Sequence, residues 1–237
     1  GRPGQGIGPY SVGKNILQIQ SGFEYGGYKN NSFDSFGMTL TPSAVVRFGI
    51  TEKIEINSAW SYQYLSYNTP LVSGSLNGIN LAGIGTRVNI VEADNYRPAI
   101  GLQLTLKIPV QSPDFDIDFI APKILLITHQ KITEKLSFQG NLGINYNGIS
   151  AQPRGIYVLS LNYAVKEKIG LFVENYGDFG NSSFSTFWDT GGYLLLNPNL
   201  QLDLFGGFAK NNDNLSYFIN TGVSRLFTKC LKNIDSN

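Results

Sequence analysis

Residues 38–64 read MTLTPSAVVRFGITEKIEINSAWSYQY, and the alternation within this stretch is the clearest structural signal in the chain. Apolar or aromatic residues stand at most alternate positions, namely Met38, Leu40, Ala44, Val46, Phe48 and Ile50, then Ile54, Ile56, Trp60, Tyr62 and Tyr64. The residues between them are mostly polar, namely Thr39, Thr41, Ser43 and Arg47, then Glu55, Asn57, Ser61 and Gln63. Because successive side chains of a strand point to opposite faces, the pattern predicts two amphipathic strands joined by a tight turn at 51–53.

The same period of two continues in both directions and predicts about twelve strands. Their expected ranges are 17–25, 38–50, 54–64, 79–91, 98–109, 119–130, 135–147, 155–166, 168–177, 184–196, 199–210 and 215–227. A tilted strand needs roughly nine to eleven residues to cross the hydrocarbon of a membrane, and these lengths suit it. Short turns alternate with longer Asn-, Gly- and Ser-rich connections such as 26–36 and 66–78, which is typical of short periplasmic turns and longer extracellular loops. An even strand number places both termini on the periplasmic side.

Composition supports a membrane barrel over a soluble protein. Of 237 residues, 15% are charged, whereas soluble domains carry about 25%. The chain holds 27 Gly, 13 Tyr and 15 Phe, and it has no run of roughly 18 to 20 apolar residues of the kind that forms a membrane helix. A soluble β-sandwich or barrel also shows a period of two, but its strands are usually about five or six residues long. The sequence therefore favours an all-β, transmembrane, antiparallel up-and-down barrel.

Charge and cysteine content exclude several function classes. A net charge of +1 with scattered basic residues gives no signal for nucleic acid. The single cysteine, Cys230, excludes an internal disulfide framework and a zinc cluster, and we expect neither a metal nor a cofactor. No charged and apolar leader begins at Gly1, so an exported protein would be shown in its mature form.

Six segments carry a family resemblance. They are GRPGQGIGPYSVGKNILQIQSGFEY at 1–25, RFGITEKIEI at 47–56, RPAIGLQLTLKIPV at 97–110, FVENYG at 172–177, LQLDLFGGF at 200–208 and GVSRLF at 222–227. Together they resemble an outer-membrane β-barrel transporter family, of the MetA-pathway of phenol degradation type. The resemblance implies a location in the outer membrane of a Gram-negative bacterium more firmly than it implies a substrate. Such barrels commonly end on an aromatic residue of the last strand, whereas Phe227 is followed by TKCLKNIDSN, which we expect to be a periplasmic tail at 228–237.

Strand parity places a set of ionisable side chains in the barrel interior. They are Glu24, Arg47, Glu55, Arg87, Lys107, Lys123, His129, Glu174, Asp189 and Asp203. Ionisable groups inside a membrane protein must be hydrated or paired. Most of the basic ones fall on the second to sixth strands and three acids fall on the ninth to eleventh, so the two arcs face each other across a closed barrel. Two outcomes are open: a water-filled passage, or a lumen closed by bridges between the arcs.

The first thirteen residues form a separate segment before the barrel at 14–227. They contain two Pro and five Gly and lack a strand pattern. Such a segment either folds inward as a plug, which would place Arg2 among the luminal acids, or extends into the periplasm.

An enzyme is not expected, because His129 is the one histidine and no serine lies in a nucleophile motif. We expect a passive channel for small polar or aromatic solutes. The alternative is a closed barrel that acts as a scaffold or accessory subunit of a larger outer-membrane assembly. The expected partners are outer-membrane lipid, lipopolysaccharide and possible other outer-membrane proteins, besides the unknown solute, and no nucleic acid.

Overall fold

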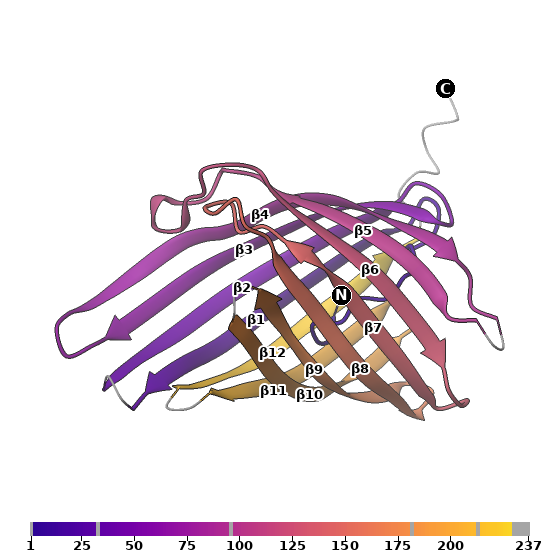
Figure 1. Cartoon of the computed structure of the whole chain (residues 1–237). Coiled ribbons are helices and arrows are strands. Elements are labelled where there is room, and N and C mark those ends of the chain that lie inside the picture. Colours follow the sequence, from indigo (N-terminus) through magenta and orange to yellow (C-terminus); the bar gives the residue numbers. More distant parts are fainter. Residues whose placement is uncertain (1, 32–33, 95–96, 181–182, 212–213, 229–237) are drawn as a thin grey trace.

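The computed structural model describes residues 2–31, 34–94, 97–180, 183–211 and 214–228, and these form a closed antiparallel barrel of twelve strands (Figure 1). The strands are β1 (Leu17–Asn30), β2 (Ser35–Gly49), β3 (Ile54–Asn68), β4 (Ser73–Val91), β5 (Ala99–Lys107), β6 (Ala121–Lys131), β7 (Leu136–Asn145), β8 (Arg154–Lys166), β9 (Ile169–Gly180), β10 (Ser183–Asn197), β11 (Leu200–Asn211) and β12 (Asn214–Phe227). Each strand pairs with its neighbours in sequence, and β12 closes onto β1 from Leu17↔Phe227 to Asn30↔Asn214. The predicted up-and-down barrel is confirmed.

Helical structure is minimal in the described part of the chain. It amounts to one short 3₁₀ turn, η1 (Pro113–Phe115). Within the same residues, no helix is both long enough and apolar enough to span a bilayer. Cys230 and the tail at 229–237 lie outside the described residues, as do Asn181 and Asn212 in two of the expected longer connections.

The barrel has a polar interior and an apolar exterior. Large apolar side chains on one parity of the strands are exposed, for example Ile56 at 51%, Leu142 at 54% and Leu204 at 56%. The other parity contributes buried polar groups, among them Glu174 and Asp203. A soluble protein shows the reverse arrangement. Lipid on the outside and polar groups on the inside account for the alternation along each strand.

Several expected loops are strands in the structure. β1 continues to Asn30 and β2 begins at Ser35, so most of the expected loop at 26–36 is paired. The expected loop at 66–78 is likewise replaced by the ends of β3 and β4, which pair as far as Asn68↔Ser73. These stretches are rich in Gly, Ser and Asn, which interrupt the one-sided apolar pattern that marked the strands. The contrast in loop length is therefore smaller than expected, and the orientation of the barrel stays a prediction.

The segment before β1 contacts the barrel wall from several sides. Its first described residue, Arg2, contacts β11 and β12, whereas Ile7 contacts β7 and Tyr10 contacts β2 and β4. Pro9 is almost fully buried, and it packs where a Cβ on Gly101 of β5 would lie. Since these strands stand around the whole circumference, the segment crosses the interior of the barrel.

Candidate functional site

All ten ionisable residues singled out by parity stand on the inward set of strand positions. Five have side chains that are buried, namely Glu55, Arg87, Glu174, Asp189 and Asp203. The other five are half-buried, namely Glu24, Arg47, Lys107, Lys123 and His129. The structure brings nine of them together in two groups, one around a cavity beside β2–β6 and one around the N-terminal segment beside β9–β12, whereas His129 lies outside both groups.

The first group is the basic cavity, which we define by Arg47, Arg87, Lys107 and Lys123 around a space of about 470 Å³. Glu55 is its one carboxylate neighbour in the ion pairs of the described residues. Nη2 of Arg47 lies 2.7 Å from Oε2 of Glu55, and Nε of Arg87 lies 3.8 Å from Oε1 of Glu55. Arg87 also donates two hydrogen bonds, of 2.9 and 2.8 Å, to Oε1 of Gln103. Ile7 of the N-terminal segment contributes to the lining.

The second group binds the N-terminal segment. Nη2 of Arg2 donates to Oδ1 of Asp203 at 2.7 Å and to Oδ1 of Asn220 at 2.7 Å. Oε2 of Glu174 accepts the backbone N–H of Gln5 at 2.7 Å. Asp189 is buried, with 2% of the residue exposed, and it is the register partner of Glu174 on the neighbouring strand. The acidic arc therefore surrounds Arg2 and the Gly-rich backbone that follows it.

Glu24 lies at the edge of this group, where its Oε2 accepts a hydrogen bond of 3.0 Å from Nδ2 of Asn220. Glu24 also lines a smaller cavity of about 270 Å³ with Tyr28, Tyr176 and Phe187. The rings of Tyr176 and Phe187 are stacked, with centroids 5.3 Å apart. Flat aromatic faces beside a carboxylate therefore stand in the interior at this end of β1, β9 and β10.

Further contacts hold the middle of the N-terminal segment. Asn141 of β7 accepts the N–H of Ile7 and donates to its carbonyl, both at 2.9 Å. Oε2 of Glu55 accepts the N–H of Val12 at 3.0 Å, and the carbonyl of Tyr10 accepts a hydrogen bond of 3.1 Å from Arg47. Asn141 is not among the ten ionisable candidates predicted from the sequence. The alternation along β7 indicates that Asn141 points inward, but nothing in the local sequence indicates that its amide binds the backbone of a distant segment.

Tyr10 and His129 form a separate contact at the wall of β6. The Tyr10 hydroxyl lies 3.4 Å from Nδ1 of His129, and the two rings meet edge to face. Partial burial raises the pKa of the Tyr10 hydroxyl above its ordinary value, so this hydroxyl stays protonated. His129 thus has a structural neighbour in the N-terminal segment. No group of three or more His, Cys, Asp or Glu suited to a metal occurs among the residues that the structure describes.

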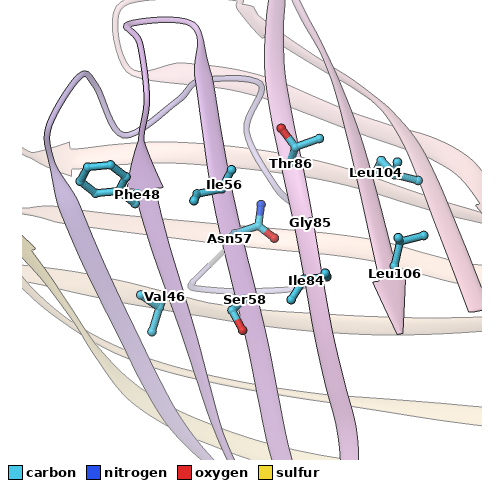
Figure 2. A pocket seen from close by; sticks show the side chains of 10 residues that line it. All are labelled: Val46, Phe48, Ile56, Asn57, Ser58, Ile84, Gly85, Thr86, Leu104 and Leu106. Atoms are coloured by element: carbon cyan, nitrogen blue, oxygen red, sulfur yellow. The ribbon is translucent and has the colours of Figure 1, made fainter. Parts of the chain in front are cut away.

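An apolar groove lies on the outer face, across the wall from the basic cavity. Figure 2 shows its side chains on β2 to β5, and its volume is about 530 Å³. Val46, Ile56, Ile84 and Leu104 are all more than a third exposed and belong to the outward parity. Short side chains at Ser58 and Thr86 create the hollow between them. This groove faces the membrane hydrocarbon.

The two charged arcs do not bridge each other. In the described ranges, each ion pair of an inward carboxylate with Arg47, Arg87 or Arg2 stays on its own side of the barrel. The acids on the far wall are instead occupied by the N-terminal segment, with Arg2 at Asp203 and the backbone of Gln5 and Gly6 at Glu174. The charge separation along the sequence therefore persists in space.

A closed barrel with this interior matches a known family over nearly its whole length. Residues 1–226 match the model of the family described as "Putative MetA-pathway of phenol degradation". The chain belongs to this family. The resemblance stated from the sequence segments is thereby confirmed. No protein of curated function matches this chain in sequence.

Solved structures similar to this member of the phenol-degradation family include an outer membrane channel, a toluene transporter and an autotransporter translocator domain. An outer membrane channel from Pseudomonas putida F1 has a TM-score of 0.75 at 10% identity, over 96% of this chain and 100% of that one. The toluene transporter TodX from Pseudomonas putida has a TM-score of 0.53 at 10% identity, over 95% and 90% of the two chains. The translocator domain of the autotransporter NalP from Neisseria meningitidis has a TM-score of 0.56 at 10% identity, over 91% and 90%. At these identities the likeness establishes the outer-membrane barrel fold.

Proposed function

We propose that this protein is a passive channel of the Gram-negative outer membrane for small aromatic or polar solutes. The observation that carries the proposal is the basic cavity of about 470 Å³ inside a closed barrel whose outer face is apolar. Charged side chains that line an internal space need water or a polar solute beside them. Passive diffusion through such an interior needs no cofactor and no catalytic residue, and the protein is not proposed to be an enzyme.

Two further observations support aromatic solutes. The stacked rings of Tyr176 and Phe187 beside Glu24 offer flat apolar faces with a polar neighbour. Aromatic pairs favour offset stacking and edge-to-face contacts, so a solute ring gains the same contacts on its way through. Among similar structures, one is described as a toluene transporter and another as a monoaromatic hydrocarbon channel.

The N-terminal segment 2–13 is proposed to be an internal plug rather than a periplasmic extension. Its anchors are the ion pair of Arg2 with Asp203, the Glu174 contacts with Gln5 and Gly6, and the two bonds between Asn141 and Ile7. It forms part of the lining of the basic cavity through Ile7. Solute flux through the barrel then requires that this segment shift within the lumen.

The accessory-subunit alternative has less support. A barrel closed by bridges between its basic and acidic arcs would serve that role, but the ion pairs of the described residues leave the arcs separate. The similar structures include channels and transporters, and a space remains between the side chains of the interior.

The test compares the parent protein with a variant that lacks residues 2–13, both refolded and reconstituted. Ion conductance is measured in planar bilayers, and swelling of proteoliposomes is measured with phenyl glucoside, an aromatic solute too polar to cross bare lipid. The parent should conduct ions and admit phenyl glucoside, and the variant that lacks residues 2–13 should do both faster. If neither protein passes ions or solute, while heat-modified gel mobility shows that both are folded, the channel proposal is wrong.

A further inference from the structure

The basic cavity holds more positive charge than its surroundings neutralise. Arg47 and Arg87 share the carboxylate of Glu55, whose Oε2 also accepts the N–H of Val12. Lys107 and Lys123 line the same space. In the described ranges no carboxylate oxygen lies within 4.0 Å of either lysine ammonium, and no hydrogen bond of these ammonium groups is found. Four cations therefore face one carboxylate.

The two lysines are neighbours on the sheet. Thr105 of β5 is the register partner of Lys123 on β6, and Lys107 follows two positions later on the same face. The lysines are thus diagonal neighbours on adjacent strands, and Cβ atoms in such positions lie about 7–8 Å or less apart. Like charges at this spacing repel each other in a space of reduced dielectric. An anion between the two ammonium groups removes the repulsion and gains a hydrogen bond from each.

Of the twelve other residues that line the cavity, six are polar and six are apolar or aromatic. Besides Ile7, the apolar or aromatic ones are Val45 of β2, Ala59 of β3, Leu81 of β4, Ala121 of β6 and Tyr146 just after β7. An inorganic anion uses the ammonium groups alone and leaves these surfaces against water. A ring attached to a carboxylate buries apolar area against them at the same time, and apolar burial is favourable at roughly 25 cal/mol per Å².

The geometry points to a binding site for a small aromatic carboxylate in the basic cavity, with Lys107 and Lys123 holding the carboxylate and the apolar lining holding the ring. This inference rests on the proposed channel function, because it names the class of solute that the interior prefers. The site is a specificity element and performs no chemistry on the solute. Neutral and cationic aromatic compounds of the same size should bind more weakly there.

The first test measures binding without transport. The detergent-folded full chain is titrated with benzoate, benzyl alcohol, benzylamine and inorganic phosphate by calorimetry. Benzoate should bind at least about tenfold more tightly than each of the other three, since hydrogen bonds to charged groups commonly give that factor. Equal binding of benzyl alcohol would overturn the role of charge. Equal binding of phosphate would overturn the aromatic part and leave only a general anion site.

The second test uses substitutions with a matched control. Lys107→Gln/Lys123→Gln should weaken benzoate binding by about tenfold or more, and Lys166→Gln should leave it unchanged, because Lys166 is exposed at the end of β8, far from the cavity lining. Heat-modified gel mobility shows that each variant is folded. Unchanged benzoate binding in the folded double variant contradicts the inference.

Transport separates this inference from the proposed function. Reversal potentials in a KCl gradient should show preference for anions in the parent, and the double variant should show a weaker preference while still conducting. If the parent and the double variant conduct with the same selectivity, the channel stands and the anion site is wrong. If benzoate binds but no protein conducts, even without residues 2–13, the site stands and the channel proposal is wrong.

Discussion

Nη2 of Arg2 lies 2.7 Å from Oδ1 of Asp203, although 201 positions separate the two residues in the chain. The carboxylate of Asp203 is fully buried by this contact, and the Arg2 guanidinium also lies 5.6 Å from the ring centroid of Phe205. Gly22 and Gly222, which are register partners on β1 and β12, leave the space that the guanidinium fills. One arginine thus anchors the start of the N-terminal segment to the wall opposite the basic cavity.

Arg2→Ala should loosen the N-terminal segment and raise ion conductance several-fold. The change removes hydrogen bonds between charged groups, which typically contribute about 1.5–3 kcal/mol each. Asp203→Asn should have the same effect, and the double variant should conduct no better than either single variant, because both remove one interaction. Lys14→Ala is the control, since Lys14 is exposed. Planar-bilayer conductance of the parent, the two single variants and the double variant tests this expectation. Additive effects of the two substitutions would show that Arg2 and Asp203 act independently.

Gly22→Ala should open the channel without weakening the barrel. A Cβ at this position would meet the guanidinium of Arg2, which is the mobile end of a long side chain and can move aside. The control is Gly83→Ala, because the nearest atom to a Cβ there is the carbonyl oxygen of Leu106 at 3.4 Å. Conductance should rise for Gly22→Ala alone, and both variants should keep the thermal stability of the parent. An increase in both variants would mean that the loss of glycine, rather than the displacement of Arg2, matters.

Leu142→Arg should lower the free energy of unfolding by about 2–4 kcal/mol if Leu142 lies near the bilayer midplane. Leu142 is 54% exposed on the outer face, where the substitution would place a charge in hydrocarbon. Its neighbour Asn141 faces inward, and Asn141→Arg should leave the barrel stable but detach Ile7, since both hydrogen bonds of the amide to that residue are lost. Urea unfolding in lipid vesicles measures the first effect and conductance measures the second. Greater instability of Asn141→Arg would reverse the assigned parity of β7.

Glu55→Gln should destabilise the barrel by about 3–5 kcal/mol, the usual consequence of removing one partner of a buried ion pair. The carboxylate is fully buried and serves Arg47, Arg87 and the N–H of Val12. Glu134→Gln, at an exposed position in the turn between β6 and β7, should have no effect. The comparison uses thermal unfolding of the two folded variants. Equal stability of both variants would show that the basic cavity needs no internal counter-charge.

The end of the barrel that carries Asn68 and Ser73 should face the cell exterior. In a Cys230→Ser background, cysteine at Asn68 should react with an impermeant reagent on intact cells, whereas cysteine at Glu134 should react only after lysis. Both positions are exposed in the structure, so access to the side chain is not limiting. The reverse labelling pattern would invert the topology and place both termini outside.

The sequence alone determined the number of strands and which side chains point inward, because alternation is a property of each strand by itself. For this reason all ten ionisable residues, from Glu24 to Asp203, stand on the inward parity in the structure. The sequence predicted β1 to β4 to be shorter than they are, because Gly, Ser and Asn interrupt the alternation at the ends of these strands. The ladder that continues to Asn30↔Ser35 depends on the partner strand rather than on local pattern.

Only the tertiary structure decided where the N-terminal segment lies and which charges it meets. Its Gly- and Pro-rich sequence has no period, and its anchors at Asp203, Glu174 and Asn141 come from strands more than a hundred residues away. The same holds for the basic cavity, where four cations from β2, β4, β5 and β6 face one carboxylate. Barrel closure and strand register bring these residues together, and the distances between them cannot be predicted from the local sequence.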